Sequence, residues 1–306
     1  MNILLTGSTG FLGRNVLELL RKSPHTIYTL SHQKDNYKNL VENIIVKKGD
    51  ISDKSSLIKI KKENLKIDTI IHIAALVPKT KEEDNEILMK KVNENGTKNL
   101  LDVFGKELRS IIYTSTSEVY GSALKNKIIN ERTRPKPISN YAKTKYQGEK
   151  IIQSYSERNK IQWIILRYSV MYGYDDPIER AVPNFIKASL QNKEIIIKGG
   201  EELRDYIHIK DAAKAILNAL DKNISGTFLI GSGKAISIKQ TAKEIVKKTK
   251  SKSKIRIEMR DKKGFDLLMD ISGSQKILNF SPNYFFPEGV DEEIKLMQLG
   301  LKKNLS

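Results

Sequence analysis

A tyrosine and a lysine stand four residues apart in the segment Tyr141-Ala-Lys-Thr-Lys145. The apolar spacing over residues 141–158 predicts an amphipathic helix, and residues four apart share one helix face. A phenol with a pKa of about 10 is a poor base at neutral pH, but a neighbouring ammonium favours its ionised form. The pair therefore predicts that Tyr141 exchanges a proton with a substrate hydroxyl, with Lys145 beside it. The alternative is an ordinary exposed helix turn, where this spacing is common.

A run of polar side chains, Ser115-Thr116-Ser117-Glu118, follows a strand predicted at residues 110–114. We expect it at the carboxyl end of a parallel sheet, where doubly wound folds bind their ligands. There the hydroxyl of Thr116 can hydrogen-bond a developing oxyanion and share the proton path with Tyr141. The alternative is a Ser/Thr-rich turn that only ends the strand.

A glycine-rich turn, Gly7-Ser-Thr-Gly10-Phe-Leu-Gly13, lies between a strand predicted at residues 3–6 and a helix predicted at 12–20. Glycines in this context let the backbone approach a pyrophosphate at the N-terminus of the helix. The turn therefore predicts a dinucleotide site, against the alternative of a purely structural turn. The residues expected to contact the cofactor are Gly7, Thr9, Gly10, Phe11, Leu12 and Gly13.

The second predicted strand, residues 27–30, does not end in the acidic residue that usually holds the ribose hydroxyls of NAD. No carboxylate precedes Asp35. Nearby side chains can instead accommodate a ribose phosphate, which favours NADP slightly over NAD: Ser31, His32 and Lys34. Asp50, after the third predicted strand, is expected either to contact the adenine or to be a plain turn residue.

Strands and helices alternate along the first half of the chain, which predicts an α/β Rossmann fold with a doubly wound parallel sheet. A dinucleotide-binding domain is expected over residues 1–170 and a smaller C-terminal α/β substrate lobe over 171–306. Residues of about 205–235 are expected to return to the first domain. The predicted strands are 3–6, 27–30, 44–47, 70–73, 110–114, 163–167, 194–197 and 228–230, and the predicted helices are 12–20, 55–62, 82–104, 141–158, 183–190, 211–220 and 237–248.

The composition narrows the possible partners and location. The net charge is +18, but the lysines are scattered along all 306 residues, which indicates a solvated surface rather than a nucleic-acid site. The chain has no cysteine and thus no thiolate metal site, and we expect no metal. No apolar run approaches the roughly 20 residues of a membrane span, and residues 1–6 do not form a signal peptide. We therefore expect a cytoplasmic protein without a nucleic-acid or membrane partner.

Seven segments in this order resemble the extended short-chain dehydrogenases, specifically the nucleotide-sugar epimerase/dehydratase family. The resemblance covers nearly the whole chain and rests on segments 7–13, 72–75, 93–99, 115–121, 141–145, 167–173 and 204–211. It implies a nucleotide-sugar substrate, NAD or NADP as cofactor, and a homodimer formed through helices at about 94–104 and 141–157.

The resemblance also implies a role for individual residues. Thr116, Tyr141 and Lys145 match the catalytic triad. Further cofactor contacts are implied or expected at Ser31, Asp50, Ile51, Ala74, Ala75 and Asn93, of which Asn93 matches a structural asparagine. Substrate contacts are expected at Ser117, Glu118, Arg180 and Arg204, with Arg204 on the nucleotide phosphates. A second phosphate-binding residue is expected among Arg260, Lys262 and Lys263.

Two departures affect the substrate site. Val170 stands where many relatives have an asparagine, and Tyr174 stands where a proline is usual. One pyrophosphate contact is therefore missing from the expected set. Arg180 either supplies the positive charge in its place or is an exposed loop residue.

The residues after Thr116 bear on the reaction. Sugar 4,6-dehydratases that resemble this chain have Asp-Glu where it has Ser117-Glu118, and loss of water needs a general acid. We therefore expect a 4-epimerase, similar to UDP-glucose 4-epimerase, that acts by hydride transfer at C4 of the sugar. The alternatives are an NADPH-dependent 4-ketosugar reductase, a decarboxylase resembling those of UDP-glucuronate, and a 4,6-dehydratase. A dinucleotide-sensing or nucleic-acid-binding protein is the non-enzymatic alternative.

Overall fold

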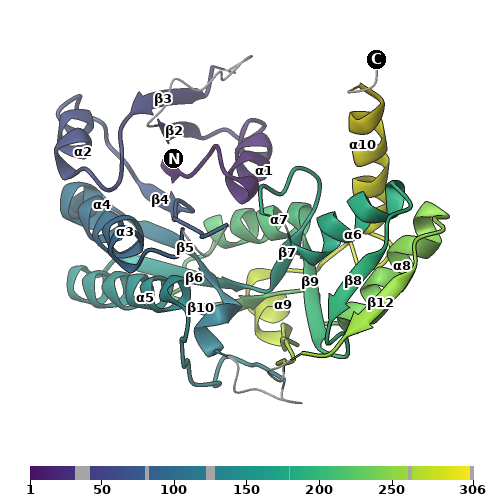
Figure 1. Cartoon of the computed structure of the whole chain (residues 1–306). Helices are drawn as coiled ribbons and strands as arrows, with labels where there is room; N and C mark the ends of the chain where they lie inside the picture. Colours follow the sequence, from purple (N-terminus) through teal and green to yellow (C-terminus); the bar gives the residue numbers. More distant parts are fainter. Residues whose placement is uncertain (32–41, 80–82, 122–127, 179, 261–263, 304–306) are drawn as a thin grey trace.

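The computed structural model of the chain describes residues 1–31, 42–79, 83–121, 128–178, 180–260 and 264–303 (Figure 1). A seven-stranded sheet forms its centre, with the strand order β10-β6-β5-β4-β1-β2-β3 and every neighbouring pair parallel. The strands are β1 (Asn2–Thr6), β2 (Thr26–Ser31), β3 (Ile44–Lys48), β4 (Thr69–His72), β5 (Ser110–Thr116), β6 (Gln162–Tyr168) and β10 (Gly226–Ile230). The predicted Rossmann sheet is confirmed.

Helices cover both faces of this sheet because its strands are apolar on both sides. In β1, Ile3 and Leu5 contribute to one buried cluster and Leu4 to the other, since neighbouring side chains on a strand point to opposite faces. One cluster includes residues of α1 (Phe11–Leu20) and α7 (Ile209–Leu220). The other includes residues of α2 (Lys54–Lys61), α4 (Gly96–Phe104) and α5 (Asn140–Asn159).

The predicted helix at 82–104 is divided into three parts. A short helix α3 (Glu86–Met89) continues into a π-helical turn, η1 (Lys90–Asn95), and then into α4. The side chain of Asn85 begins α3 by accepting a hydrogen bond from the N–H of Leu88. Residue 82 lies outside the described residues. A π-turn inside an α-helix is rare and often lies at a functional site.

Beyond β6 the chain builds two small sheets and returns once to the large sheet as β10. One small sheet has the order β11 (Ala235–Ser237), β9 (Leu203–His208) and β7 (Val170–Tyr172), and the other pairs β12 (Ile255–Glu258) with β8 (Ile195–Lys198). The helices here are α6 (Ala181–Leu190), α8 (Ile238–Thr249), α9 (Ser272–Leu278) and α10 (Val290–Lys303). Short 3-10 turns, η2 (Gly105–Glu107) and η3 (Ser117–Tyr120), flank β5.

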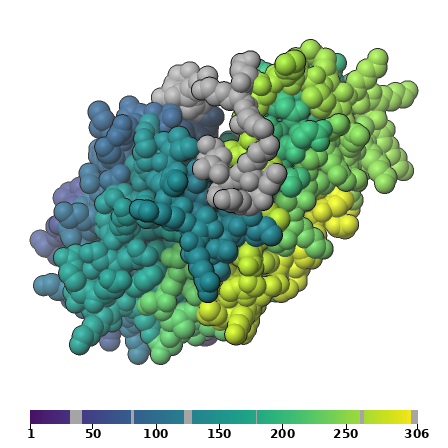
Figure 2. All heavy atoms as spheres, turned by 90° about the horizontal axis from the view of Figure 1, so that it is seen from below, coloured from purple at the N-terminus to yellow at the C-terminus, as the bar shows by residue number. Residues whose placement is uncertain are grey.

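The sequence prediction was incomplete in this second part, where β7, β9, β11, β12, α9 and α10 were not expected. The expected return of residues 228–230 to the large sheet is confirmed by the pairing of β10 with β6. A bridge between Ile129 and Met269 also joins the two parts, whose teal and yellow residues lie together in Figure 2. The division of the chain at residue 170 stays a prediction.

The described residues contain neither a membrane-spanning helix nor a cluster suited to a metal ion. None of the helices there combines the length and the apolar character that a bilayer crossing requires. The same residues contain no group of three or more His, Cys, Asp or Glu side chains suited to a metal ion.

Candidate active site

The glycine turn brings backbone atoms so close together that side chains do not fit. A β-carbon on Gly7, whose φ is +75°, would lie 2.6 Å from the nitrogen of Ala74, and one on Gly13 would lie 1.9 Å from the oxygen of Gly7. Gly10 begins α1 without a side-chain cap, and the first turn carries no acidic residue. The N–H groups of this turn therefore suit a phosphate, so the residues present fit the pyrophosphate of a dinucleotide.

Other predicted cofactor residues follow the neighbouring strands at the same sheet edge. Ser31 is the last residue of β2 and is buried, whereas Ala74 and Ala75 follow β4. Asp50 follows β3, and its Oδ1 accepts a hydrogen bond of 2.8 Å from the N–H of Ser52. That bond is typical of a turn and leaves the adenine contact a prediction. Ile51 is buried after the same strand; His32, Lys34 and Asp35 lie outside the described residues.

Asn93, inside the π-turn η1, joins two segments of the site. Its Oδ1 accepts from the N–H of Leu76 at 2.7 Å, and its Nδ2 donates to the oxygen of Leu76 at 3.1 Å. The same nitrogen donates to Oγ1 of Thr144 at 3.1 Å. The loop after β4 is therefore bound to the helix that carries Tyr141 and Lys145, which agrees with the structural role implied for Asn93.

The first two turns of α5 carry Tyr141 and Lys145. Ser139 begins the helix, because its Oγ accepts from the N–H of Ala142 at 3.1 Å. Tyr141 is partly exposed, whereas Lys145 is 2% exposed and its Nζ lies 4.0 Å from the centre of the Tyr113 ring. Burial lowers the pKa of Lys145 to about 7, although the charge of Glu149 acts in the opposite direction.

The segment after β5 is bound to the start of α5. Oγ1 of Thr116 accepts from the N–H of Glu118 at 3.2 Å, and Oε2 of Glu118 accepts from Oγ of Ser139 at 3.2 Å. Ser117 is buried beside them. The side chain of Glu118 remains accessible to water, yet the surrounding protein raises the pKa of its carboxyl above the usual value.

Arg180 is a basic residue whose charge reaches Tyr141. Arg180 immediately precedes α6, and its Nη1 lies 2.9 Å from Oδ2 of Asp176. Burial and the charge of Glu118 raise the pKa of Tyr141, and Arg180 lowers it. The protein by itself thus raises the pKa of the phenol, because burial outweighs the charge of Arg180. A lowering by Lys145 together with the positive ring of a bound cofactor stays a prediction.

Arg204 lies on β9, and Arg260 follows β12. Nη1 of Arg204 donates to the oxygen of Phe265 at 2.6 Å, and its guanidinium lies 4.8 Å from the centre of that ring. Nη1 of Arg260 lies 3.2 Å from Oε1 of Glu202. Burial is the main cause that lowers the pKa of Arg204, and the charge of Arg260 contributes. The two guanidiniums therefore lie near each other; Lys262 and Lys263 are outside the described residues.

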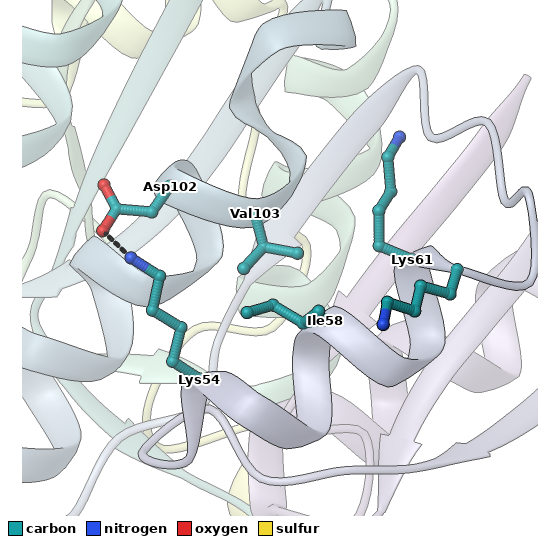
Figure 3. Close-up of a pocket in the computed structure, with 6 residues that line it drawn as sticks. Lys54, Ile58, Lys61, Asp102 and Val103 are labelled. Atoms are coloured by element: carbon teal, nitrogen blue, oxygen red, sulfur yellow. Dashed lines mark hydrogen bonds and ion pairs between the residues drawn. The ribbon is translucent and has the colours of Figure 1, made fainter.

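A surface pocket of about 320 Å³ between α2 and α4 contains none of these residues (Figure 3). Two of its three lysines are paired: Lys54 with Asp102 at 2.6 Å and Lys61 with Glu107 at 2.5 Å. We assign this pocket no part in the site.

Sequence reasoning missed three residues that organise the site: Ser139, Asp176 and Glu149. Ser139 had a usable pattern, since a serine just before a helical segment predicts a helix cap. Asp176 and Glu149 each stand four residues from a basic residue, Arg180 and Lys145, but that spacing alone does not distinguish a buried contact from an exposed pair.

The fold, the glycine turn and the Tyr–Lys pair define an NAD-dependent Rossmann-fold enzyme of the extended short-chain dehydrogenase type. The model of the NAD dependent epimerase/dehydratase family matches residues 3–231, and the chain belongs to this family.

Three similar proteins are named for three different reactions. A UDP-N-acetyl-alpha-D-glucosaminuronate decarboxylase of Bacillus cytotoxicus is 28% identical over 95% of this chain and 96% of its own. A dTDP-D-glucose 4,6-dehydratase of Homo sapiens is 31% identical over 83% of this chain and 76% of its own. A crystal structure of UDP-glucose 4-epimerase with UDP-glucose, from Thermotoga maritima, has a TM-score of 0.89 and 25% identity, covering 98% of this chain and 100% of its own.

Proposed function

We propose that this enzyme is a nucleotide-sugar 4-epimerase that uses NAD or NADP and acts by hydride transfer at C4 of the sugar. The observation that carries the proposal is the link between Glu118 and Ser139. It holds the segment of Thr116 against the helix of Tyr141 and Lys145, at the sheet edge where the glycine turn lies. Proximity of an acid/base group to a second hydroxyl and to a hydride acceptor is what this chemistry requires.

In the proposed reaction, Tyr141 as phenolate takes the proton of the C4 hydroxyl. The Thr116 hydroxyl accepts a hydrogen bond from the N–H of Glu118. In the proposed reaction this hydroxyl donates its own proton in a hydrogen bond to the same sugar oxygen. A dinucleotide held at the turn of Gly7, Gly10 and Gly13 would supply the hydride acceptor for C4, and return of the hydride to the other face of the 4-ketosugar would give the epimer. Tyr141 gives its proton back, so C4 is inverted without net oxidation. Lys145 and Arg180 supply positive charge that favours the phenolate.

Ser117 supports epimerisation over dehydration. A 4,6-dehydratase must protonate a leaving hydroxyl, and Ser117 stands where the resembling dehydratases have an aspartate. Ser117 is buried, and a serine hydroxyl is too weak an acid for that step.

Decarboxylation of a nucleotide-linked uronic acid is the second candidate, supported by Glu118 and by the similarity to a decarboxylase. It shares the oxidation at C4, after which the carboxylate leaves as carbon dioxide. For either reaction we propose that Arg180, Arg204 and Arg260 bind the phosphates of the substrate, and that the enzyme forms a homodimer through α4 and α5.

Incubation of the purified enzyme with a panel of nucleotide sugars, followed by NMR, tests the proposal. We expect inversion at C4 with no net consumption of NAD(P)H. Release of carbon dioxide from a uronic acid favours the decarboxylase, and stoichiometric use of NADPH favours a reductase.

Substitution of the phenol tests the role of Tyr141. We expect Tyr141→Phe to lower turnover by about 10²–10⁴-fold, while Tyr146→Phe, on the same helix, leaves it within about twofold. Turnover within about twofold of the wild type in Tyr141→Phe contradicts the mechanism.

A further inference from the structure

A buried ion pair lies directly behind the Tyr–Lys pair. Glu149 follows Lys145 by one turn of α5 and is 1% exposed, and its partner Arg167 lies near the end of β6. Nε and Nη2 of Arg167 donate to the two carboxylate oxygens of Glu149 at 3.0 and 2.6 Å. The proposed reaction uses neither residue.

The ion pair between α5 and β6 is also hydrogen-bonded to β5 and to η3. Oγ of Ser115, the residue before Thr116, donates a short hydrogen bond to Oε1 of Glu149. Nη1 of Arg167 donates to the hydroxyl of Tyr120, at the end of η3, at 2.8 Å. Glu149 therefore accepts three hydrogen bonds, which fix the position of its carboxylate.

Stability alone does not explain such a pair. Transfer of two charges out of water costs several kcal/mol for each ion, and apolar residues of similar volume often stabilise a protein as well or better. A structural role at this position does not require a carboxylate. The negative charge of the Glu149 carboxylate is the property that an apolar pair lacks.

The surroundings of Lys145 show what that charge does. The ammonium faces the ring of Tyr113 from β5, and its charge also reaches the buried His72 of β4, whose pKa burial lowers to about 3. His72 is thus neutral and adds no second positive charge beside Lys145. Glu149 is buried one turn further along α5, and its charge opposes the effect of burial on the pKa of Lys145.

We propose that Glu149 is a positioning residue that keeps Lys145 in its ammonium form, and that Arg167 holds the Glu149 carboxylate in place. The inference rests on the proposed role of Lys145 beside Tyr141. Without a fixed negative charge one turn away, burial would leave the lysine largely neutral at pH 7, and a neutral amine favours the phenolate of Tyr141 much less.

Titration of Lys145 tests this directly. The full-length enzyme carries ¹³C-labelled lysine, and the ε-carbon resonance is assigned by its loss in Lys145→Met. We expect Glu149→Gln, which keeps the shape and one acceptor oxygen, to lower the midpoint of Lys145 by about one pH unit or more, because loss of a nearby opposite charge disfavours the ammonium form. Glu157→Gln, the same change at an exposed position of α5, leaves the midpoint unchanged.

A double variant covers the case in which Glu149→Gln leaves Arg167 unpaired and fails to fold. Glu149→Gln with Arg167→Met removes both charges, and we expect a smaller but clear fall of the Lys145 midpoint. If the Lys145 midpoint in the double variant equals that of the wild type, the proposal is overturned. Any fall in Glu149→Gln alone would then come from the repulsion of an unpaired Arg167, not from the loss of the Glu149 charge.

Activity gives the second readout. In the sugar-interconversion assay, the alkaline limb of kcat/KM moves to lower pH by the same amount as the Lys145 midpoint. An unshifted alkaline limb beside a lowered Lys145 midpoint contradicts the positioning role. If no sugar of the panel reacts, the proposed function has failed, whereas the NMR titration still decides whether Glu149 sets the charge of Lys145.

Discussion

Oγ of Ser139 lies 3.2 Å from Oε2 of Glu118, so the residue that begins α5 also holds the carboxylate that follows β5. One serine hydroxyl thus accepts from the N–H of Ala142 and donates to Glu118. The position of Tyr141 relative to Thr116 depends on Ser139, because this residue caps the helix of Tyr141 and hydrogen-bonds the segment that follows Thr116.

Two substitutions at Ser139 separate its roles. Ser139→Ala removes the cap and is expected to cost about 1 kcal/mol of unfolding free energy with little change in the pH profile. Ser139→Asp keeps a good cap but adds a negative charge beside Glu118. Since negative charge already raises the pKa of Tyr141, we expect the acid limb of kcat/KM to move to higher pH. Urea unfolding and pH–rate profiles measure the two effects, and identical acid limbs in both variants would contradict this electrostatic account.

Two glycines of the same turn are expected to respond differently to alanine. A β-carbon on Gly13 would lie 1.9 Å from the oxygen of Gly7, so Gly13→Ala should lose about 3 kcal/mol or more of unfolding free energy. A β-carbon on Gly10 would meet only that oxygen, at 3.3 Å, and its φ of −74° suits alanine. Gly10→Ala should therefore fold well.

The added methyl of Gly10→Ala would nevertheless stand at the N-terminus of α1, where we expect the pyrophosphate. We predict that calorimetry finds NAD bound about tenfold more weakly or worse, a loss of about 1.4 kcal/mol. A variant that binds NAD as tightly as the wild type would show that the pyrophosphate does not approach this turn.

The sequence predicted the elements with strong local patterns and missed those fixed by tertiary contacts. The glycine turn and the Tyr141–Lys145 spacing are local, and both lie where they were expected. Strand β9 was missed because its buried residues include Asp205, a residue type that sequence patterns assign to the surface. In a sequence, Glu149 is simply a glutamate four residues after a lysine on a helix, which usually indicates an exposed pair.

The electrostatics of the site were the least predictable property. The sequence indicated that an ammonium lies near Tyr141, but the pKa of the phenol in the protein alone also depends on how much protein surrounds each group. Burial of Lys145 and of the Tyr141 phenol outweighs their spacing on the helix. Only the three-dimensional arrangement gives that balance.

Asp205 holds three segments of the C-terminal part together. Its Oδ1 accepts from the N–H and Oγ of Ser232 at 2.7 and 2.8 Å, and its Oδ2 accepts from the N–H of Gly233 at 3.2 Å and of Met269 at 3.4 Å. In Asp205→Asn, the amide N–H₂ replaces one carboxylate oxygen and faces hydrogen-bond donors. We therefore expect urea unfolding to show a loss of about 1–3 kcal/mol of unfolding free energy. Asp270→Asn, at a less buried turn, should stay within about 0.5 kcal/mol. Equal effects of both substitutions would show that the network around Asp205 contributes little.

Glu293, in the first turn of α10, is expected to make stability depend on pH. Its side chain is 1% exposed, and its Oε2 has no hydrogen-bond partner among the described residues. Burial and the nearby Asp176 raise the pKa of Glu293 to about 8. An unfolded glutamate has a pKa of about 4.3, so between these values the folded state binds more protons. The free energy of unfolding therefore falls as pH rises from about 5 to 8.

Glu293→Gln removes this titration. Relative to the wild type, we expect the variant to gain on the order of 2–4 kcal/mol of unfolding free energy between pH 5 and 8 in urea melts at matched ionic strength. Other buried carboxyls with raised pKa values, such as Asp205, contribute to both proteins and cancel in the difference. Glu292→Gln, the neighbouring exposed residue that pairs with Lys210, is the control and should show no such trend. If the difference between Glu293→Gln and the wild type stays constant from pH 5 to 8, then Glu293 is ionised in the folded protein throughout that range, and some group outside this account must neutralise it.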